Sequence, residues 1–416
     1  MKSRFADKKI GVFGFGCVGQ GLYDVVEACE ELGLEIVKIC VKDRQKPRAL
    51  PASVFTFDPQ ELLTDNRIDV LVELISNADE AYELVKQALL AGKTVVSANK
   101  KMVAEHLPEL VKLQQEHGGV LLYEASVCGS IPIIRMLEAY YGTEPLQEVS
   151  GILNGSSNYI LHKLASGGLS YGEALAQAQE LGFAEADPSL DVQGIDALNK
   201  LCIVAAHAFG VFVHPNEVLR FGIQHITKDD IALAGEVGAV IKLVGTARWS
   251  AGGKLVLQVL PTFVPQQREL YHVNAEFNAV EVEPAFAGKQ LLKGRGAGSH
   301  PTGSAVWADV AAALTGYRYT YAKLLQNQSP ALDKEAPVRI YVRAKLAALV
   351  KLPWLIIESA LETGEESIVV GQIKQKDMEV YQPELEEKEI FVAEIPAEIN
   401  VEDFSKIIPL DVASVV

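Results

Sequence analysis

The chain has 416 residues, 49% of them apolar, and its 38 basic and 54 acidic residues give a formal net charge of −16. This length is enough for two or three domains that each bury a core. The charge argues against nucleic acid or an anionic membrane as the main partner, since both would repel the average surface. Five scattered cysteines with no C-x-x-C pair predict neither a disulfide framework nor a zinc knuckle. No signal peptide and no run of 18 apolar residues is evident, so we expect a cytoplasmic protein.

Up to about residue 123, short β-branched runs alternate with longer amphipathic runs. Strands are predicted at 9–13, 35–41, 70–74, 94–97 and 120–122, and helices at 18–31, 80–91 and 104–117. Continuous apolar strands that alternate with helices indicate a parallel sheet buried on both faces. We therefore expect an α/β fold that begins with a doubly wound sheet.

The pattern changes after Pro132. Predicted helices at 133–141, 158–165, 171–181 and 192–209 mix with strands near 149–153, 255–259 and 279–282, which indicates an α+β domain. A helix at 304–314 follows a glycine-rich loop and is a candidate to return to the first domain. A polar linker at 326–330 opens a C-terminal segment with strands at 338–342 and 367–370 and an acidic, solvated stretch at 384–389.

A glycine-rich turn follows the first predicted strand and opens the first predicted helix. Its G-x-G-x-x-G pattern consists of Gly14, Phe15, Gly16, Cys17, Val18 and Gly19. Such glycines permit a tight turn, close approach of the backbone to a pyrophosphate and close packing of helix on strand, while the helix N-terminus faces the negative charge. The pattern is weak alone, but both flanks fit here, so we predict dinucleotide binding.

The end of the second strand bears on the choice between NAD and NADP. Asp43 can accept a hydrogen bond from a ribose 2′-hydroxyl, whereas Lys42 and Arg44 can hold a 2′-phosphate. We favour NADP over NAD. A third interpretation is that these charges only solvate a loop.

Two further segments follow predicted parallel strands, at the sheet edge where ligands bind in open α/β folds. Lys100 could meet cofactor and substrate together, or could be an ordinary residue at a helix start. Glu124 precedes a glycine-containing turn that ends at Pro132, and its carboxylate with backbone carbonyls would suit a hard cation. From the residues alone, a hinge between domains, with Pro132 at a helix start, is the favoured interpretation of that turn.

The most informative stretch runs from Leu181 to Lys200 and carries four carboxylates just before an apolar helix. Asp196 and Lys200 are four residues apart, so they share one helix face. A helix that is apolar on nearly all sides is a buried one. Burial lowers the pKa of a lysine and a nearby carboxylate restores it, a balance that suits proton transfer. The alternative is an ordinary ion pair of little consequence.

The remaining motifs carry weaker signals. A second glycine-rich turn at 294–304 suits either closure over a cofactor or a return loop, with Thr302 or Ser304 as a candidate N-cap of the next helix. His207, on the apolar helix, is expected to be a hydrogen-bonded core residue. No G-x-S-x-G motif supports a hydrolase.

Together these blocks resemble the homoserine dehydrogenase family, over roughly residues 8 to 320. The motifs occur in the family's order: the Gly14–Gly19 fingerprint, Ala98-Asn99-Lys100, Glu124-Ala125-Ser126-Val127, Asn154–Leu161, Gly182–Lys200 and Gly296-Ala297-Gly298. The resemblance implies interconversion of L-homoserine and L-aspartate 4-semialdehyde with NADP or NAD, a step toward threonine, isoleucine and methionine. It also implies a homodimer or homotetramer.

The resemblance assigns roles by position. Lys200 matches the acid/base lysine, Lys100 the lysine that meets cofactor and substrate, and Glu185 the residue that holds the substrate amino group. Asp191 and Asp196 match carboxylates of the same pocket. Further matches are a cofactor contact at Gly298 and a site for Na⁺ or K⁺ formed by Glu124, Val127, Gly129 and Ile131.

The implied fold has three parts. A Rossmann-type dinucleotide-binding domain spans 1–132 and is completed by about 300–325, an α+β catalytic and dimerisation domain spans 133–299, and a small α+β module spans 331–416. Residues 338–345 begin like a strand of a regulatory ACT module, but the Asp-x-Pro-Gly-Val turn is absent. That module is therefore at most a degenerate ACT-like domain, and threonine feedback is not expected.

Two alternative functions stay open at this stage. One is another amino-acid dehydrogenase of similar build, such as an aspartate dehydrogenase. The other is a non-catalytic NAD(P)-sensing regulator, which would need the glycine turn but no proton donor. The joint presence of Glu185, Asp196 and Lys200 argues against the regulator.

Overall fold

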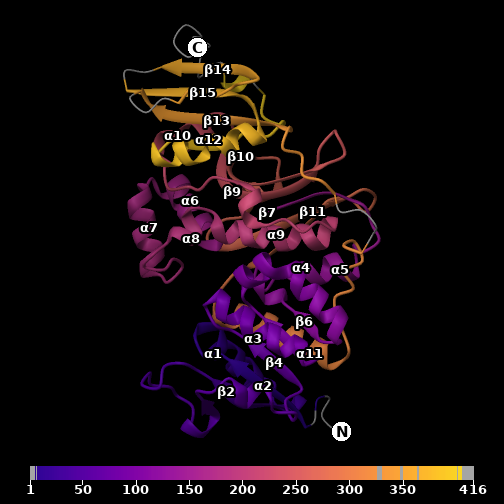
Figure 1. The fold of residues 1–416 in the computed structure, drawn as a ribbon. Helices are drawn as coiled ribbons and strands as arrows, with labels where there is room; N and C mark the ends of the chain where they lie inside the picture. The colour runs from indigo at the N-terminus through magenta and orange to yellow at the C-terminus, as the bar shows by residue number, and fades with distance from the viewer. Residues whose placement is uncertain are drawn as a thin grey trace. The chain divides into compact units, whose positions relative to one another are not determined.

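The structure is a computed structural model that describes residues 5, 7–325, 330–346, 350–362, 365–400 and 402–404. The predicted linker at 326–330 lies outside the described residues, except for Pro330. The chain forms two compact units (Figure 1). The first consists of Met1–Glu144, Cys202–Pro215 and Gly294–Ser329, and the second of Pro145–Leu201, Asn216–Lys293 and Pro330–Val416.

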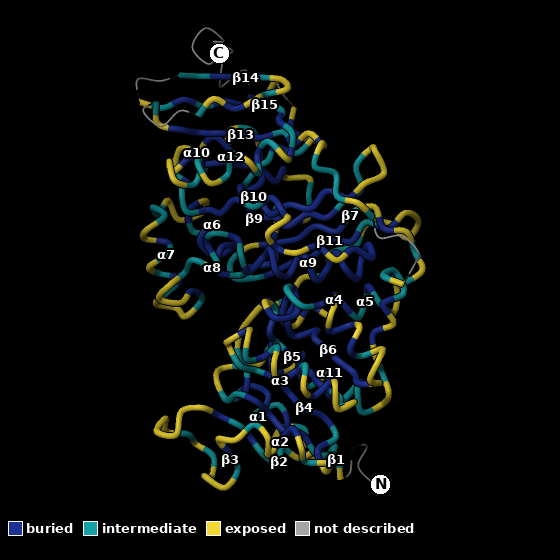
Figure 2. Tube along the Cα trace, in the orientation of Figure 1, coloured by how far each residue is buried: buried dark blue, intermediate teal, exposed yellow. Residues whose placement is uncertain are grey.

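The first unit contains the predicted doubly wound sheet. Its six strands have the order β3-β2-β1-β4-β5-β6, and every pairing is parallel. All residues of β4 and β6 are buried (Figure 2), which explains why these strands are almost entirely apolar. The strands are β1 (Lys8–Phe13), β2 (Leu34–Cys40), β3 (Phe55–Thr56), β4 (Val70–Glu73), β5 (Thr94–Ser97) and β6 (Val120–Leu122). The predicted Rossmann-type topology is confirmed.

Helices connect these strands, as expected for parallel pairing. Asn77 and Asn99 cap α3 and α4, since each side chain accepts a hydrogen bond from the backbone three residues on. The helices of this unit are α1 (Cys17–Ala28), α2 (Gln60–Leu63), α3 (Ala78–Leu90), α4 (Lys100–His117), α5 (Ile133–Ala139) and α11 (Ser299–Leu314). Helix α1 ends at Ala28, before the predicted residue 31, because the chain turns through a 3₁₀ segment into Gly33 at φ 71°.

Helix α11 packs against α1 and starts earlier than predicted. Its N-cap is Gly298 at φ 118°, so the predicted caps Thr302 and Ser304 are wrong: both lie inside the helix. Pro301 does not prevent this start, because a first-turn residue has no intrahelical partner for its N–H. The helix approaches α1 so closely that a Cβ on Gly303 would lie 2.5 Å from the carbonyl carbon of Gly21.

We expect Gly303→Ala to destabilise the first unit by roughly 1–3 kcal/mol, because the two helix backbones must separate to admit one methyl group. The measurement is the midpoint of urea unfolding. Gly235→Ala, in helix α10 (Lys228–Glu236), is the matched control: no atom lies within 4 Å of its added Cβ, and alanine favours helix. An unchanged midpoint for Gly303→Ala would show that the contact is not tight.

The second unit is built on a mixed sheet with the order β12-β11-β7-β9-β10-β16-β13-β15-β14, and β8 also pairs with β10. Its longest pair is the antiparallel hairpin of β9 and β10, which sequence patterning missed at β9 because Lys242 and Gly245 interrupt the apolar run. The strands are β7 (Leu146–Ile152), β8 (Leu219–Arg220), β9 (Ala239–Trp249), β10 (Leu255–Pro265), β11 (Phe277–Pro284), β12 (Gln290–Arg295), β13 (Pro337–Lys345), β14 (Ile356–Glu362), β15 (Glu366–Lys374) and β16 (Phe391–Glu394).

One predicted helix of this unit starts three residues later in the structure than expected. The predicted 192–209 segment begins only at Ile195, because Gly194 adopts φ 78° and separates it from a preceding short helix. The helices are α6 (Gly155–Gly167), α7 (Tyr171–Glu180), α8 (Ser189–Val192), α9 (Ile195–Phe209), α10 and α12 (Gln375–Glu387). The chain passes from the second unit to the first within α9. In the described part of the chain, no helix has the length and apolar character needed to cross a membrane.

The described residues after 330 share their core with the rest of the second unit. Val338 and Ile340 on β13 pack in one apolar cluster with Leu260 on β10. On the other face of β13, the buried Arg343 binds the buried Asp230 of α10, with Nε 2.8 Å from Oδ1. Strand β16 lies between β10 and β13. This segment is therefore a continuation of the second unit's sheet.

Candidate active site

The Gly14–Gly19 turn has the geometry of a nucleotide cradle. Gly14 adopts φ 97°, and a Cβ there would lie 2.6 Å from the carbonyl oxygen of Leu74. A Cβ on Gly19 would lie 2.9 Å from the Gly14 oxygen, so this glycine permits α1 to pack onto the turn. Gly16 has no atom within 4 Å of the same position, so space is open above the turn. Glycine is thus suited to each of the three positions for a different steric reason: the turn at Gly14, helix packing at Gly19 and open space for a ligand at Gly16.

The N-terminus of α1 is bare. Gly16 is its N-cap, no side chain caps it, and no acidic residue occupies its first turn. The first backbone N–H groups therefore face the open space, as an anion site requires. Helix α11 starts beside this turn, since Ser299 Oγ donates to the Cys17 carbonyl at 2.8 Å, and Gly298 immediately precedes it. The predicted cofactor residues Gly14–Gly19 and Gly298 thus lie together, and they fit a dinucleotide pyrophosphate.

The loop after β2 carries the residues expected to choose between NAD and NADP. The Asp43 carboxylate accepts from its own loop, at 2.8 Å from Gln45 N and 3.1 Å from Lys46 N. Lys42 forms an ion pair with Glu80 of α3. The Arg44 guanidinium lies 4.3 Å above the Phe57 ring. Asp43 is therefore engaged as a turn residue, while the cations of this loop remain at its surface.

Lys100 is the first residue of α4 and lies at the carboxyl end of β5. A hydrogen-bond network that the sequence did not reveal fixes this helix start. Glu73, at the end of β4, accepts from Ser97 Oγ at 2.6 Å and from Ile75 N at 2.7 Å. Asn99 donates to the Ile75 carbonyl at 3.1 Å while capping α4. Burial raises the pKa of Glu73 to about 7.

That raised pKa makes stability depend on pH. The folded carboxyl holds its proton more tightly than the unfolded one, so its stabilisation is complete below about pH 4.5 and is lost as pH rises toward 7. Relative to Glu73→Gln, the free energy of unfolding of the unchanged chain is expected to fall by on the order of 3 kcal/mol from pH 4.5 to 8. Urea unfolding at several pH values measures it. The exposed carboxylate of Glu116 provides the control Glu116→Gln; parallel pH curves for the chain and Glu73→Gln would contradict the assignment.

Glu124, predicted as a cation ligand, is buried and binds the start of α5. Its two carboxylate oxygens accept from Ile134 N and Arg135 N, both at 2.8 Å. Burial, and then the nearby Asp309 carboxylate, raise its pKa to about 8. Asp309 in turn forms an ion pair with Arg135, and burial raises the pKa of Asp309 to about 6. The buried carboxylates of Glu124 and Asp309 thus both lie near the guanidinium of Arg135.

The turn after Glu124 is unusually bent. Cys128 and Gly129 adopt φ 53° and 50°, and a Cβ on Gly129 would lie 2.7 Å from the Arg295 carbonyl oxygen. Its predicted ligands Val127 and Ile131 are both buried. Across the described residues, no cluster of three or more His, Cys, Asp or Glu side chains is arranged to hold a metal ion. A cation here would depend on backbone carbonyl oxygens.

In the second unit, Lys200 and Asp196 form the predicted pair on one face of α9. Nζ and Oδ2 are 2.7 Å apart, and the two side chains are only 7% and 4% exposed. The Lys200 ammonium also donates to the Leu153 carbonyl at 2.8 Å. An ammonium group has three N–H donors, and these two contacts account for two of them. The Lys200 ammonium therefore has one N–H donor left for a ligand.

Asn154 is the functional residue that sequence reasoning missed. Its side-chain nitrogen donates to Asp191 at 2.7 Å and to Asp196 at 2.9 Å, so it joins two carboxylates that are both acceptors. Its oxygen caps α6 by accepting from Ser157 N at 2.8 Å. Burial, and then the Asp196 charge, raise the pKa of Asp191. The available signal was its position as first residue of the specific Asn154–Leu161 block.

The structure divides the predicted site residues between the units. Gly14–Gly19, Lys42, Arg44, Lys100, Gly298 and the Glu124–Ile131 turn belong to the first, and Glu185, Asp191, Asp196 and Lys200 to the second. Glu185 is exposed in the loop between α7 and α8, where its backbone carbonyl accepts from Gln179 at 3.0 Å. His207 is a hydrogen-bonded core residue as predicted, with Glu138 at 2.6 Å and Tyr123 at 2.8 Å.

Known proteins match both regions. A family model described as homoserine dehydrogenase matches residues 132–311, and one described as its NAD-binding domain matches 14–124. The homoserine dehydrogenase of Synechocystis sp. is 39% identical over 312 residues, covering 73% of this chain and 72% of that protein. That of Bacillus subtilis is 34% identical over 387 residues, covering 89% of each.

Solved structures agree. The crystal structure of a homoserine dehydrogenase from Thiobacillus denitrificans has a TM-score of 0.80 at 31% identity, covering 94% of this chain and 98% of that one. A hyperthermophilic archaeal homoserine dehydrogenase in complex with NADPH has a TM-score of 0.65 at 28% identity, covering 75% and 99%. With relatives above 30% identity along most of its length and matches to both functional regions, the chain belongs to the homoserine dehydrogenase family of NAD(P)-dependent oxidoreductases.

Proposed function

We propose that Lys200 is the acid and base in the family's reaction, the NAD(P)-dependent interconversion of L-homoserine and L-aspartate 4-semialdehyde. The supporting observation is its buried ammonium, which Asp196 and the Leu153 carbonyl hold by two of three N–H donors. The third N–H would bind the substrate oxygen. In oxidation, neutral Lys200 takes the hydroxyl proton; in reduction, its ammonium polarises the aldehyde and protonates the developing alkoxide.

The carboxylates of the second unit would hold the substrate's amino group. Asp191 is oriented by Asn154 and lies close enough to Asp196 to feel its charge. An ammonium ion bound there would offset the repulsion between the two carboxylates. Glu185, on the exposed loop before α8, would reach the same amino group from the solvent side.

The first unit would hold the cofactor, with the pyrophosphate at the Gly14–Gly19 turn and a further contact from Gly298. When bound, the nicotinamide accepts or supplies the hydride. Lys100 would orient cofactor and substrate from the start of α4, whose position the Glu73 network maintains. We favour NADP, because Lys42 and Arg44 lie at the loop surface while the Asp43 carboxylate is taken up by its own turn.

A monovalent cation, Na⁺ or K⁺, is also part of the proposal. Glu124 and the backbone carbonyls of Val127, Gly129 and Ile131 would be its ligands. The buried carboxylate and the bent turn support the site, because a hard cation takes oxygen ligands and would offset the cost of burying that charge.

Exhaustive desalting into choline chloride is expected to lower activity at least fivefold, and KCl or NaCl should restore it. Glu124→Gln keeps one oxygen acceptor but removes the charge, so it should abolish the response to the cation. Initial rates at constant ionic strength measure both effects. Activity that is indifferent to the three chloride salts would remove the cation from the proposal.

The wider setting follows from the resemblance. The reaction would serve threonine, isoleucine and methionine biosynthesis in the cytoplasm, carried out by a homodimer or homotetramer. Residues 1–132, completed by about 300–325, would bind the dinucleotide; residues 133–299 would bind substrate and form the dimer contact; residues 331–416 would be a degenerate ACT-like module.

One assay separates this function from its rivals. Purified protein is tested with L-homoserine and with L-aspartate, each with NAD and with NADP. Turnover of homoserine alone, faster with NADP, is the expected result. Turnover of aspartate alone would indicate an aspartate dehydrogenase, and cofactor binding without turnover would indicate the regulator.

A further inference from the structure

Two of the carboxylates that the proposed function uses are placed by a very short junction. Asp191 lies on α8 and Asp196 on α9, and only Gln193 and Gly194 separate the two helices. Asn154 joins the two carboxylates, because its side-chain nitrogen donates to both. The conformation of this two-residue junction therefore decides how far apart the carboxylates lie and which way they point.

The chain at β8 and just after it holds this junction in place. Ile223 N donates to the Val192 carbonyl at 2.7 Å, and the Arg220 guanidinium donates to the Gln193 carbonyl. The last carbonyls of a helix have no partner within it, so these contacts complete the end of α8. Gly222 packs so closely that a Cβ there would lie 2.3 Å from the Val192 oxygen. Of these contacts, the one from Arg220 is made by a side chain and can be removed by substitution.

Arg220 is also connected to the C-terminal segment. Its guanidinium lies 3.6 Å from the Glu386 carboxylate of α12, and the two side chains are 17% and 30% exposed. Burial lowers the pKa of Arg220, and the Glu386 charge opposes that effect. A guanidinium has several N–H donors in a planar fork, so it can bind a carbonyl and a carboxylate together. Arg220 therefore bridges α12 and the α8–α9 junction.

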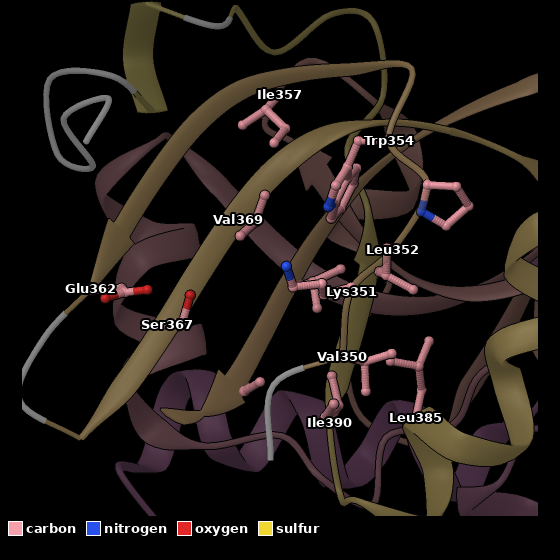
Figure 3. Close-up of a pocket in the computed structure, with 13 residues that line it drawn as sticks. Val350, Lys351, Leu352, Trp354, Ile357, Glu362, Ser367, Val369, Leu385 and Ile390 are labelled. Carbon is pink, nitrogen blue, oxygen red and sulfur yellow. The ribbon is translucent and has the colours of Figure 1, made fainter. Parts of the chain in front are cut away.

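The apolar neighbours of Arg220 hold its backbone against the same helix. Leu219 and Phe221 belong to one buried cluster with Leu385 of α12. Figure 3 shows Leu385 in the wall of a largely apolar cavity formed by residues after 330. The place of Arg220 thus depends on how the C-terminal segment packs on the rest of the unit.

We propose that Arg220 is a positioning residue for the substrate's ammonium group, and that Glu386 of the C-terminal segment keeps it in that position. The inference rests on the proposed function, in which Asp191 and Asp196 bind that ammonium. Without the guanidinium, the end of α8 loses a partner and the two carboxylates lose their alignment, so homoserine binds more weakly. Lys200 keeps its two hydrogen-bond partners, so the proton transfer itself changes less.

Steady-state kinetics of the full chain test this role. Arg220→Gln is expected to raise the KM for L-homoserine about tenfold, while kcat stays within about threefold and the KM for NADPH is unchanged, because substrate binding is weakened and the chemistry is not. Arg220→Lys keeps the charge but lacks the planar fork, so it should restore part of the affinity. Glu386→Gln should raise the KM for homoserine about threefold, since Arg220 then loses one of its two partners.

Arg268→Gln is the matched control. Arg268 is also 17% exposed, and it forms ion pairs with Glu148 on β7 and Glu281 on β11. This substitution should lower the thermal midpoint but leave the KM for homoserine within about twofold. An equal rise in KM for both arginine variants would indicate a general loosening of the unit and overturn the role of Arg220, as would an unchanged KM in Arg220→Gln. If the unchanged chain does not oxidise homoserine, the proposed function fails and this role fails with it.

Discussion

Lys200→Met is expected to lower kcat for homoserine oxidation by roughly 1,000-fold or more, with little change in cofactor affinity. Asp196 and the Leu153 carbonyl both hold the ammonium in place, and positioned proton transfer contributes about 10² to 10⁴ in rate. Loss of the polarising charge adds to this. Steady-state kinetics measure the rate, and quenching of tryptophan fluorescence by NADPH measures cofactor binding.

A control must separate lost chemistry from lost stability, because Asp196 becomes a buried charge without its partner. Lys242 is a second buried lysine of the same unit, with Nζ 2.6 Å from the Val273 carbonyl and 3.1 Å from Asn158. Lys242→Met also removes a buried ammonium, but one held only by neutral oxygens, and should leave kcat within about threefold; the thermal midpoint of both variants shows how far each is destabilised. A Lys200→Met protein that retains a tenth of the original kcat would refute the assignment.

Gly16→Asp is expected to raise the KM for NADPH at least 100-fold in a protein that is no less stable. Gly16 is the uncapped N-cap of α1, and its φ of −92° suits any residue. Aspartate is a good N-cap, worth about 0.5–2 kcal/mol relative to alanine. Its carboxylate would occupy the open space above the turn and repel a pyrophosphate there.

Gly16→Asn is the matched variant, because asparagine has nearly the same shape and also caps helices but carries no charge. Its KM should lie between those of the unchanged chain and Gly16→Asp, and the difference between the two variants measures the electrostatic part. Unaltered NADPH affinity in Gly16→Asp would mean that the pyrophosphate does not bind at this turn.

Most strands of the first unit's sheet could be predicted because each is marked by residues close together in the sequence. Strands β5 and β6 have the predicted bounds, since each is a short apolar run between polar turns. The two-residue strand β3 gives no periodic signal. In the second unit, β9 was missed because it contains Lys242, and a lysine is not expected inside a buried strand. Its burial is explained only by its hydrogen bonds to Asn158 and to the Val273 carbonyl, which the sequence does not reveal.

The site shows the same limit. Asp196 and Lys200 could be paired from sequence because one helical turn separates them. Asn154 is 42 residues from Asp196, and Glu73 is 24 residues from Ser97, so these hydrogen bonds depend on how strands and helices pack. The start of α11 at Ser299, earlier than predicted, also depends on tertiary packing: no side chain caps the helix there, and α11 lies very close to α1.

The continuity of the second unit's sheet limits how this chain can be shortened. A version ending near residue 330 would lack β16, which covers part of β10, and would leave a strand edge available for pairing between molecules. It would also leave the buried Asp230 carboxylate without its partner, the guanidinium of Arg343. Such a truncated version of this chain should aggregate unless the exposed edge of β10 and the Asp230 position are redesigned as well.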